Sequence, residues 1–351
     1  MTSSAIRPYR VGPNKVPVYY AGGERIDRFR RESQLGGPED WVASVTSFPS
    51  HLLPSGANPD IGVSPLADGR SLRAVIAADP LAWLGPELVA AFGTEPGLLV
   101  KLLDAGERLP VHCHPSRAVA QVRLGSRFGK TEGWILLEVA PDAGMWLGFN
   151  RSVSFDELQQ WVEAQDVAAM LAAMNRLEVR PGDVLYVPVG LPHAFGPGVL
   201  LIELQEPTSF SLLAEYRRFG LTDQQATLGL GWEIALDCFD RTAFDASRLA
   251  TVRPHPYLVR QEPGGRIERL FGAEAAPYFQ AYRVTVEGTL RLDDLVGYAI
   301  PIVTRGAGVM RWKDGEEPLT EGQTWVTPYG VGALELAGSL EVIWCAPPNP
   351  A

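Results

Sequence analysis

The chain has 351 residues, of which 46% are hydrophobic and 21% charged, and its formal net charge is −10. This composition is typical of a globular protein with a large core, built as two domains or as one duplicated domain. The acidic balance, without a basic run, disfavours nucleic acid as a partner. No apolar stretch reaches the length of a membrane span, and residues 1–10 lack the apolar core of a signal peptide, so we expect no membrane partner.

The cysteines and the turn-forming residues narrow the class further. Cys113, Cys238 and Cys345 form an odd, scattered set that suits no disulfide framework, which favours a reducing, cytoplasmic setting. The 36 glycines and 29 prolines indicate many short strands joined by turns. A mainly β chain is therefore expected.

Short strands and one helical segment are predicted for the first part of the chain. Residues 8–23 favour irregular or edge-strand structure, and Trp41–Phe48 alternates enough to predict a strand. Ser71–Phe92 has helical spacing, and Pro80 is expected to divide it into two short helices. Leu98–Leu103 is almost wholly apolar, which predicts a buried strand.

A helical insert is predicted between strands in the middle of the chain. Ser154–Leu177 carries apolar residues at helical spacing, and Ser154 with Glu157 three residues later forms a capping box. A short helix is expected at Leu230–Phe239. The predicted strands around these helices are Trp134–Val139, Val184–Val187 and Val199–Leu204.

β-prone runs return from about residue 256, separated by turn signals such as Asp314-Gly315. The chain thus has two strand-rich halves. We expect residues 1–255 to form one domain, with helical inserts at about 60–95 and 152–178, and residues 256–351 to form a second.

The stretch from Gly106 to His114 favours a metal site. It has a glycine turn, five residues and then His-Cys-His. Alternate residues of a strand point the same way, so His112 and His114 can share one ion while Cys113 points to the opposite side, into packing.

A second motif brings a third imidazole. After Gly182, the residues Pro188 and Gly190 predict a tight turn that returns His193 toward the same cavity. Three of the five histidines lie in these two motifs, which favours a shared ion over isolated, partly exposed side chains. Three imidazoles and a carboxylate suit Zn, Fe, Mn, Co or Ni. Spacing alone leaves four candidate carboxylates, which are Glu107, Glu132, Glu138 and Glu203.

The two spacings resemble the two motifs of the cupin barrel. The resemblance implies a mainly β fold with helical inserts, made of two cupin (jelly-roll β-barrel) modules. The second half repeats the turn as Gly322, Pro328 and Gly330 but has Ala333 in the place of the histidine. We therefore expect the C-terminal module to keep the turn geometry, to lack metal ligands, and to serve packing and shape one wall of the first cavity.

The chain is similar to the type I mannose-6-phosphate isomerase family in its short bacterial form. The segments that carry this resemblance are Gly22-Gly23, Glu39-x-Trp41, Leu98 to Ala105, His114-Pro115, Gly129 to Glu132, Gly182-Asp183, Pro188 to Ala194, Glu203-x-Gln205 and Ala235 to Asp237. The resemblance implies one divalent metal ion, expected to be zinc, held at four positions. These are His112 in the place of the family's Gln, then His114, Glu132 and His193.

The resemblance also implies a reaction. The family interconverts mannose 6-phosphate and fructose 6-phosphate through a cis-enediol, which needs a Lewis acid and a base that moves a proton between C1 and C2. Lys130 stands at the family's catalytic lysine, and Glu39 and Glu203 stand at its acidic pocket positions. The implied partner is a small-molecule sugar or sugar phosphate, and the sequence indicates no oligomeric state.

Several positions depart from the family pattern. The replacements are Ala21 for Trp, Pro110 for Ser, His112 for Gln, Ser209 for Asp and Leu213 for an active-site Arg. A leucine cannot replace the paired hydrogen bonds of a guanidinium, and Arg217 or Arg218 could substitute only if one of them reached the site. We therefore keep two alternatives to the family reaction. One is a metal-dependent cupin enzyme acting on a non-phosphorylated sugar, and the other is a catalytically inactive sugar-binding regulatory homologue.

Overall fold

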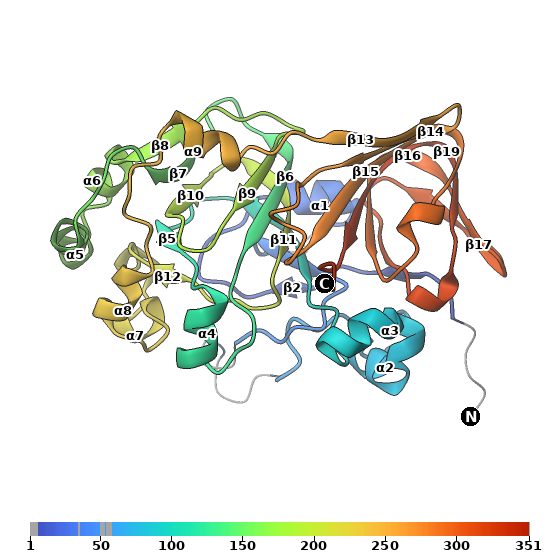
Figure 1. Ribbon diagram of the computed structural model, residues 1–351, viewed down its shortest axis with the longest axis horizontal. Helices are drawn as coiled ribbons and strands as arrows, with labels where there is room; N and C mark the ends of the chain where they lie inside the picture. Colours follow the sequence, from blue (N-terminus) through green and yellow to red (C-terminus); the bar gives the residue numbers. More distant parts are fainter. Residues whose placement is uncertain (1–5, 34–35, 50–52, 54–57, 351) are drawn as a thin grey trace.

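Three antiparallel sheets organise the chain, which a computed structural model describes over residues 6–33, 36–49, 53 and 58–350 (Figure 1). A six-stranded sheet and a five-stranded sheet belong to the N-terminal half, and an eight-stranded sheet belongs to the C-terminal half. The six-stranded sheet has the spatial order β2 (Lys15–Val16), β3 (Glu39–Val42), β4 (Leu99–Ala105), β11 (Val199–Gln205), β6 (Glu132–Val139) and β9 (Val184–Val187).

The other two sheets lie on either side of this one. The five-stranded sheet has the order β12 (Leu212–Leu213), β5 (His112–Cys113), β10 (His193–Phe195), β7 (Met145–Phe149) and β8 (Met174–Leu177). The eight-stranded sheet has the order β1 (Tyr9–Val11), β18 (Thr324–Val326), β16 (Ile300–Trp312), β19 (Glu335–Ala346), β15 (Gln280–Arg291), β14 (Gly265–Arg269) and β13 (Tyr257–Glu262), with β17 (Gly315–Thr320) paired to β16. The prediction of a mainly β chain with helical inserts is confirmed.

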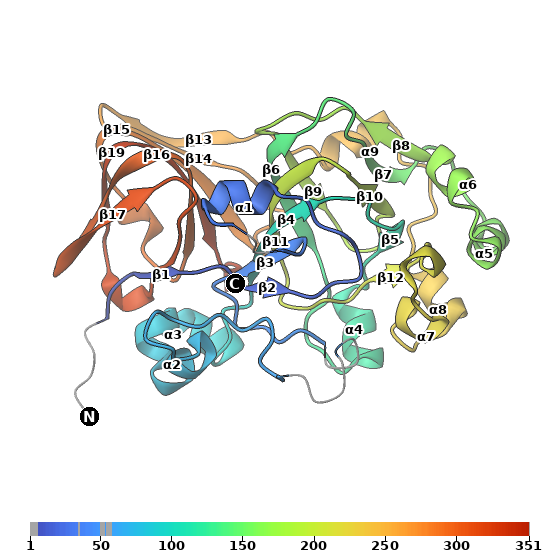
Figure 2. The ribbon, with the colours of Figure 1, turned by 180° about the vertical axis from the view of Figure 1, so that it is seen from behind.

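The first strand of the chain belongs to the C-terminal sheet. In the register of β1 with β18, Tyr9 pairs with Val326 and Val11 pairs with Thr324. Figure 2 shows β1 running along the C-terminal module before the chain enters the N-terminal one. Arg30 strengthens this connection, since it donates to Asp40 and, across to the other module, to the Thr324 hydroxyl.

Helices surround the sheets. They are α1 (Arg25–Arg30), α2 (Leu72–Ala78), α3 (Pro80–Phe92), α4 (Arg117–Arg123), α5 (Phe155–Ala164), α6 (Val167–Ala172), α7 (Asp223–Ala226), α8 (Trp232–Asp237) and α9 (Ala246–Thr251). Helix α3 packs against the C-terminal module, where a Cβ at Gly85 would meet Tyr329. The predicted division at Pro80 is confirmed, because Ser71 caps α2 and Asp79 caps α3 with Pro80 in its first turn. The helix predicted near Leu230 is confirmed as α8.

Two sequence predictions need correction. The strand predicted at Trp41–Phe48 is β3, which ends at Val42 because Ala43 has a φ of 47° that cannot continue the ladder. The helix predicted over Ser154–Leu177 is α5 and α6, broken at Gln165 with a φ of 52°, and its last residues form β8. Only half of the capping box forms: Ser154 accepts from the Glu157 amide, but the Glu157 carboxylate binds Arg151.

Within the described chain, no single helix is long and apolar enough to cross a membrane, although α2 and α3 pass that test as a pair bent by 78°. The buried side chains of these two helices include Leu72, Ile76 and Trp83, which belong to the core cluster shared by both modules.

The six-stranded sheet is buried on both faces, and this places the polar side chains. In β4, Val100 and Leu102 pack into the cluster shared with the C-terminal module, whereas Leu103 packs into the interior of the N-terminal module. Since alternate strand residues share a face, Lys101 points the same way as Leu103, into that interior. The interior of the N-terminal module is where the candidate site lies.

The two modules approach closely at Gly133 in β6. A Cβ atom at this position would lie 2.6 Å from Phe271 and 2.7 Å from Phe279, two rings of the C-terminal module. A glycine is therefore what lets these aromatic side chains pack directly on the sheet.

Candidate metal centre and active site

Three buried imidazoles meet inside the N-terminal module. His112 in β5 and His193 in β10 face each other across adjacent strands, and His114 follows just beyond the end of β5. One potential ligand atom from each of the three lies within 4.8 Å of the others. In the part of the chain that the structure describes, no other group of three or more potential ligands is found. The predicted opposite direction of Cys113 is confirmed, since Cys113 is buried in an apolar cluster.

Backbone carbonyls fix the protonation of each ring. The Nδ1 atoms of His112, His114 and His193 lie 2.8, 2.7 and 2.8 Å from the carbonyl oxygens of Pro110, Phe210 and Leu191. A carbonyl oxygen only accepts, so each Nδ1 donates and each Nε2 carries a lone pair instead of a proton. The Nε2 atom of His193 is buried without any hydrogen-bond partner. An unpartnered lone pair beside two more is what a metal ion requires, so these residues fit a divalent metal.

A carboxylate stands beside the imidazoles. The Oε1 atom of Glu132 lies 3.1 Å from Nε2 of His114, and its Oε2 atom lies 3.7 Å from Nε2 of His193. The ammonium of Lys130 lies 2.8 Å from the same Oε1 atom and 3.4 Å from Nε2 of His114. Three imidazoles and one carboxylate form a common donor set for zinc and related ions.

The other three candidate carboxylates lie away from the imidazoles. Glu107 accepts from the Ala21 amide and from Arg218, and Glu138 pairs with Arg25 and Arg28. Glu203 faces the interior, where its carboxylate pairs with the ammonium of Lys101.

Lys101 is a residue of this interior that was not predicted from the sequence to belong to the site. Its ammonium lies 3.2 Å from Oε2 of Glu39 and 3.1 Å from Oε2 of Glu203, and all three side chains are buried. The register of β4 with β11 pairs Lys101 directly with Glu203. A lysine in the middle of an apolar strand was the available signal, because a buried charge needs a partner.

Aromatic side chains complete the partners of these carboxylates. The Tyr20 hydroxyl donates to Glu39 at 2.5 Å, and the Trp41 indole donates to the second oxygen at 2.7 Å. The Trp134 indole donates to Glu203 at 3.2 Å. Glu39 is thereby held rigidly, with both oxygens occupied.

Burial and neighbouring charges set the protonation states. Burial, followed by the Glu132 carboxylate, raises the pKa of Glu203 to about 7 in spite of Lys101. Burial also opposes charge on Glu39, but Lys101 and the Tyr20 hydrogen bond hold the pKa of Glu39 below its ordinary value. Burial, then the adjacent His114, lowers the pKa of His193 to about 3. Burial lowers the pKa values of His112 and His114 too, so all three rings are neutral at pH 7, the form that binds metals.

Similar proteins come from one enzyme family. Mannose-6-phosphate isomerase ManA of Bacillus subtilis is 28% identical over 248 residues, which are 70% of this chain and 73% of that protein. A crystal structure of the mannose 6-phosphate isomerase from Bacillus subtilis matches with a TM-score of 0.74 at 21% identity, over 96% of this chain and 99% of that one. The chain thus resembles bacterial mannose-6-phosphate isomerases in sequence over 70% of its length. No family model matches it.

The prediction of a mainly β fold of the cupin type is confirmed by this match. A structure of a mannose 6-phosphate isomerase bound with zinc and yttrium also matches, with a TM-score of 0.71 at 12% identity, over 97% of this chain and 100% of that one. In the present chain, the three-histidine group is the one that could hold a metal ion among the described residues.

Two of the positions that depart from the family pattern, Pro110 and Leu213, adjoin the imidazole of His112. Pro110 supplies the carbonyl that orients His112, and Leu213 pairs with His112 across β12 and β5. Arg217 donates to the Glu163 carbonyl at the surface, and Arg218 pairs with glutamates there. Both arginines are exposed, and neither has a contact with the three histidines.

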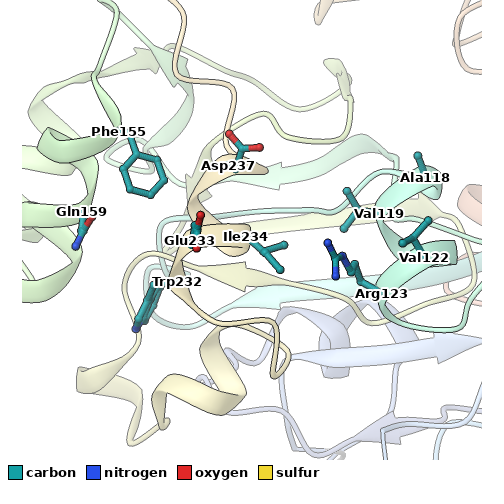
Figure 3. Close-up of a pocket in the computed structure, with 10 residues that line it drawn as sticks. All are labelled: Ala118, Val119, Val122, Arg123, Phe155, Gln159, Trp232, Glu233, Ile234 and Asp237. Carbon is teal, nitrogen blue, oxygen red and sulfur yellow. The ribbon is translucent and has the colours of Figure 1, made fainter.

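Two cavities lie near this region, and only one adjoins the imidazoles. A hollow of about 1130 Å³ lies between α4, α5 and α8, with Val122, Phe155 and Trp232 among its walls (Figure 3). None of the predicted site residues lines it. A smaller cavity of about 410 Å³ is lined by Phe210 and Leu213, which directly contact His114 and His112.

Proposed function

We propose that this protein is a metal-dependent aldose–ketose isomerase that acts on a hexose or hexose phosphate, as mannose-6-phosphate isomerases do. One divalent metal ion, expected to be zinc, would be held by His112, His114, Glu132 and His193. The observation that carries the proposal is the set of three Nε2 lone pairs, one of them without any protein partner, that meet beside a carboxylate in a buried interior.

The reaction moves a hydrogen between C1 and C2 of the sugar through a cis-enediol. The bound metal would supply a Lewis acid that polarises the sugar carbonyl. Glu203 would take the proton from one carbon and return it to the next, because its pKa of about 7 lets it both accept and donate near neutral pH. Lys101, between Glu203 and Glu39, would hold the carboxylates in position and balance their charge.

Lys130 and Glu39 would position the sugar. The ammonium of Lys130 is buried among the proposed ligands, so it can donate to a sugar oxygen that develops negative charge. Glu39 would stay ionised through the reaction, because Lys101 and the Tyr20 hydroxyl stabilise its charge. Lys130, Glu39 and Glu203 are thus the proposed catalytic residues.

The test combines metal analysis with turnover. The purified protein should contain about one equivalent of a divalent metal, and dialysis against a chelator should abolish isomerisation of both mannose and mannose 6-phosphate. Added zinc, manganese or cobalt should restore it. Turnover that persists in protein shown to be metal-free would contradict the proposal. So would metal-loaded protein that turns over neither mannose nor mannose 6-phosphate.

The three cysteines agree with a reducing compartment. Cys113 and Cys345 are buried and Cys238 is half-buried, and all three are free thiols. We propose a cytoplasmic location, where the sugar substrate would be met as a free small molecule.

A further inference from the structure

The 410 Å³ cavity adjoins the proposed metal centre through the backbone. Phe210 lines it, and the Phe210 carbonyl accepts the hydrogen bond that orients His114. Leu213 lines it and pairs with His112 in the β12–β5 register. This is the cavity whose wall lies next to two of the three imidazoles, so it is the candidate space for the part of a sugar that extends beyond C1 and C2.

Tyr19 joins the cavity to the carboxylate side of the centre. The ring of Tyr19 lines the cavity and contacts the ring of Tyr20 edge to face, with centroids 5.5 Å apart. Tyr20 in turn donates to Glu39. Residues of the cavity wall thus contact the imidazole group directly and the lysine–glutamate group through Tyr20.

Neutral polar groups on the cavity wall are free to bind a ligand. Among the described residues, the hydroxyls of Tyr19, Ser209 and Ser211 make no hydrogen bond with the protein. Thr208, by contrast, donates to the Gly129 carbonyl and is already occupied. Free hydroxyls of this kind exchange hydrogen bonds with the hydroxyls of a sugar.

The apolar part of the wall has a complementary role. Leu213, Leu221 and Leu228 line the same cavity. Apolar side chains can cover the C–H faces of a sugar, but they cannot compensate the loss of water from a phosphate group.

The charges around the cavity disfavour an anion. Its described lining contains no lysine or arginine, and residues 50–52 and 54–57, next to Pro49 in the chain, contain none in their sequence. Arg73 contacts the lining residue Ser47, but its guanidinium is held by the Val45 carbonyl and Asp60.

We propose that the substrate of this isomerase is an aldose or ketose without a phosphate group, whose distal hydroxyls bind in the cavity lined by Tyr19, Ser209 and Ser211. This substrate class rests on the proposed isomerase function. It differs from the sugar phosphate named for the homologues, because the wall offers neutral hydroxyls where a phosphate requires cationic donors.

The test uses the metal-loaded, full-length protein with matched sugars. We expect kcat/KM for mannose to exceed that for mannose 6-phosphate by at least about tenfold, the worth of one charge-assisted hydrogen bond. Binding is measured separately with mannitol and mannitol 1-phosphate, two polyols that cannot isomerise, by calorimetry or by the rise in Tm. Mannitol should bind and mannitol 1-phosphate should bind at least about tenfold more weakly.

A cation placed on the wall should reverse the preference. Ser211→Lys should raise kcat/KM for mannose 6-phosphate about tenfold over wild type, because the new ammonium pairs with the phosphate. Ser211→Gln, of similar length and without charge, is the matched control: it loses the same hydroxyl but should not raise kcat/KM for mannose 6-phosphate. The same two variants are compared in the polyol binding assay.

The outcomes separate this proposal from the isomerase function. If neither sugar is turned over but mannitol binds in preference to its phosphate, the isomerase function is wrong and the neutral cavity stands. If mannose 6-phosphate is turned over as well as mannose or better, or if mannitol does not bind, the proposed substrate class is wrong, whatever the isomerase activity.

Discussion

The two cupin modules of this chain differ most in what they bury. Buried lysines, glutamates and histidines fill the interior of the N-terminal module, including Lys101, Glu132 and His193. In the C-terminal module the buried polar side chains among the described residues are two threonines, Thr324 and Thr327. Burying charged side chains is costly. Their presence in the interior of the N-terminal module therefore indicates a functional site there.

The turn that precedes His193 in the N-terminal module also differs from the corresponding turn before Ala333 in the C-terminal module. Gly182 and Gly322 have similar φ angles of 91° and 87°, but Gly190 has a φ of 77°, whereas the left-handed glycine of the C-terminal copy is Gly332, with a φ of 75°. The expectation that the C-terminal turn keeps the same geometry is therefore wrong. A short 3₁₀ turn, η4 (Tyr329–Val331), occupies that segment and places Ala333 differently.

The C-terminal module is filled with apolar side chains instead. Trp325, Trp344 and Leu336 belong to its own buried cluster. Its expected packing role is confirmed, since Phe271 and Phe279 join the cluster shared with the six-stranded sheet. None of its described residues lines the 410 Å³ cavity beside the imidazoles.

The largest expected effect comes from giving the histidine turn of the N-terminal module the residue found at the same place in the C-terminal module. His193→Ala copies Ala333 and removes one imidazole from the proposed set. We expect stoichiometric metal to be lost and kcat/KM to fall by roughly a thousandfold, as when a main electrostatic contribution to a transition state is removed. Metal content and turnover are the measurements. His255→Ala, at an exposed position, is the control, and a His193→Ala protein with a full metal complement would refute the ligand assignment.

The next largest effect is expected on the free energy of unfolding, when a buried ammonium group is removed from the N-terminal module. Lys101→Met leaves Glu39 and Glu203 without their shared cation, so we expect a loss of about 3–5 kcal/mol in the free energy of unfolding. Arg311→Met removes a half-exposed cation from the C-terminal module and should cost less than about 1 kcal/mol. Urea titration of both variants measures the difference. Equal losses would show that the two modules do not differ in this respect.

Acid should act on the imidazoles of the first module. The folded protein holds the pKa values of His112, His114 and His193 below 6.5, whereas an unfolded chain binds protons at about that pH. The unfolded state then binds more protons, so the stability of the metal-free protein should fall as the pH drops below about 6.5. Each imidazole contributes up to about 1.4 kcal/mol for each pH unit.

Thermal unfolding of chelator-treated protein between pH 7.5 and 5 measures this effect. His112→Gln, which has one imidazole fewer, should show a shallower dependence. An unchanged Tm across the range in wild type would contradict the burial of neutral rings.

The contact between the modules gives the smallest effect. Gly133→Ala would press a methyl group against Phe271 and Phe279, and we expect a loss of about 1–3 kcal/mol from this overpacking. Gly12→Ala has nothing within 4 Å of the new Cβ and serves as the control. Unfolding free energies from denaturant titration distinguish the two. A Gly133→Ala protein as stable as wild type would show that the interface adapts easily.

Local patterns predicted most strands and helices, but not the points at which they end. The limits of β3 and α5 depend on left-handed residues, Ala43 and Gln165, whose type gives no warning of such a conformation. Motif spacing indicated the three histidines, since strand alternation places His112 correctly and a turn returns His193. His114 lies just outside the short β5, yet reaches the same centre.

Contacts between distant segments could not be predicted in the same way. The approach of Lys101 to Glu39 depends on the pairing of β3 with β4, which no local pattern specifies. The choice of Glu132 among four carboxylates came from the family resemblance, and the structure places this one beside the imidazoles. Contacts of this kind depend on sheet register, which is fixed only when the whole core packs.

The pairing of β1 with β18 has a consequence for how the protein is made. Tyr9–Val11 leaves the ribosome long before its partner strand Thr324–Val326 is synthesised. The C-terminal sheet therefore cannot be completed until Thr324–Val326 is available, and β1 stays unpaired while the N-terminal module folds. A fragment that stops at residue 255 would leave this edge open permanently, and we expect such a fragment to aggregate where the full chain does not.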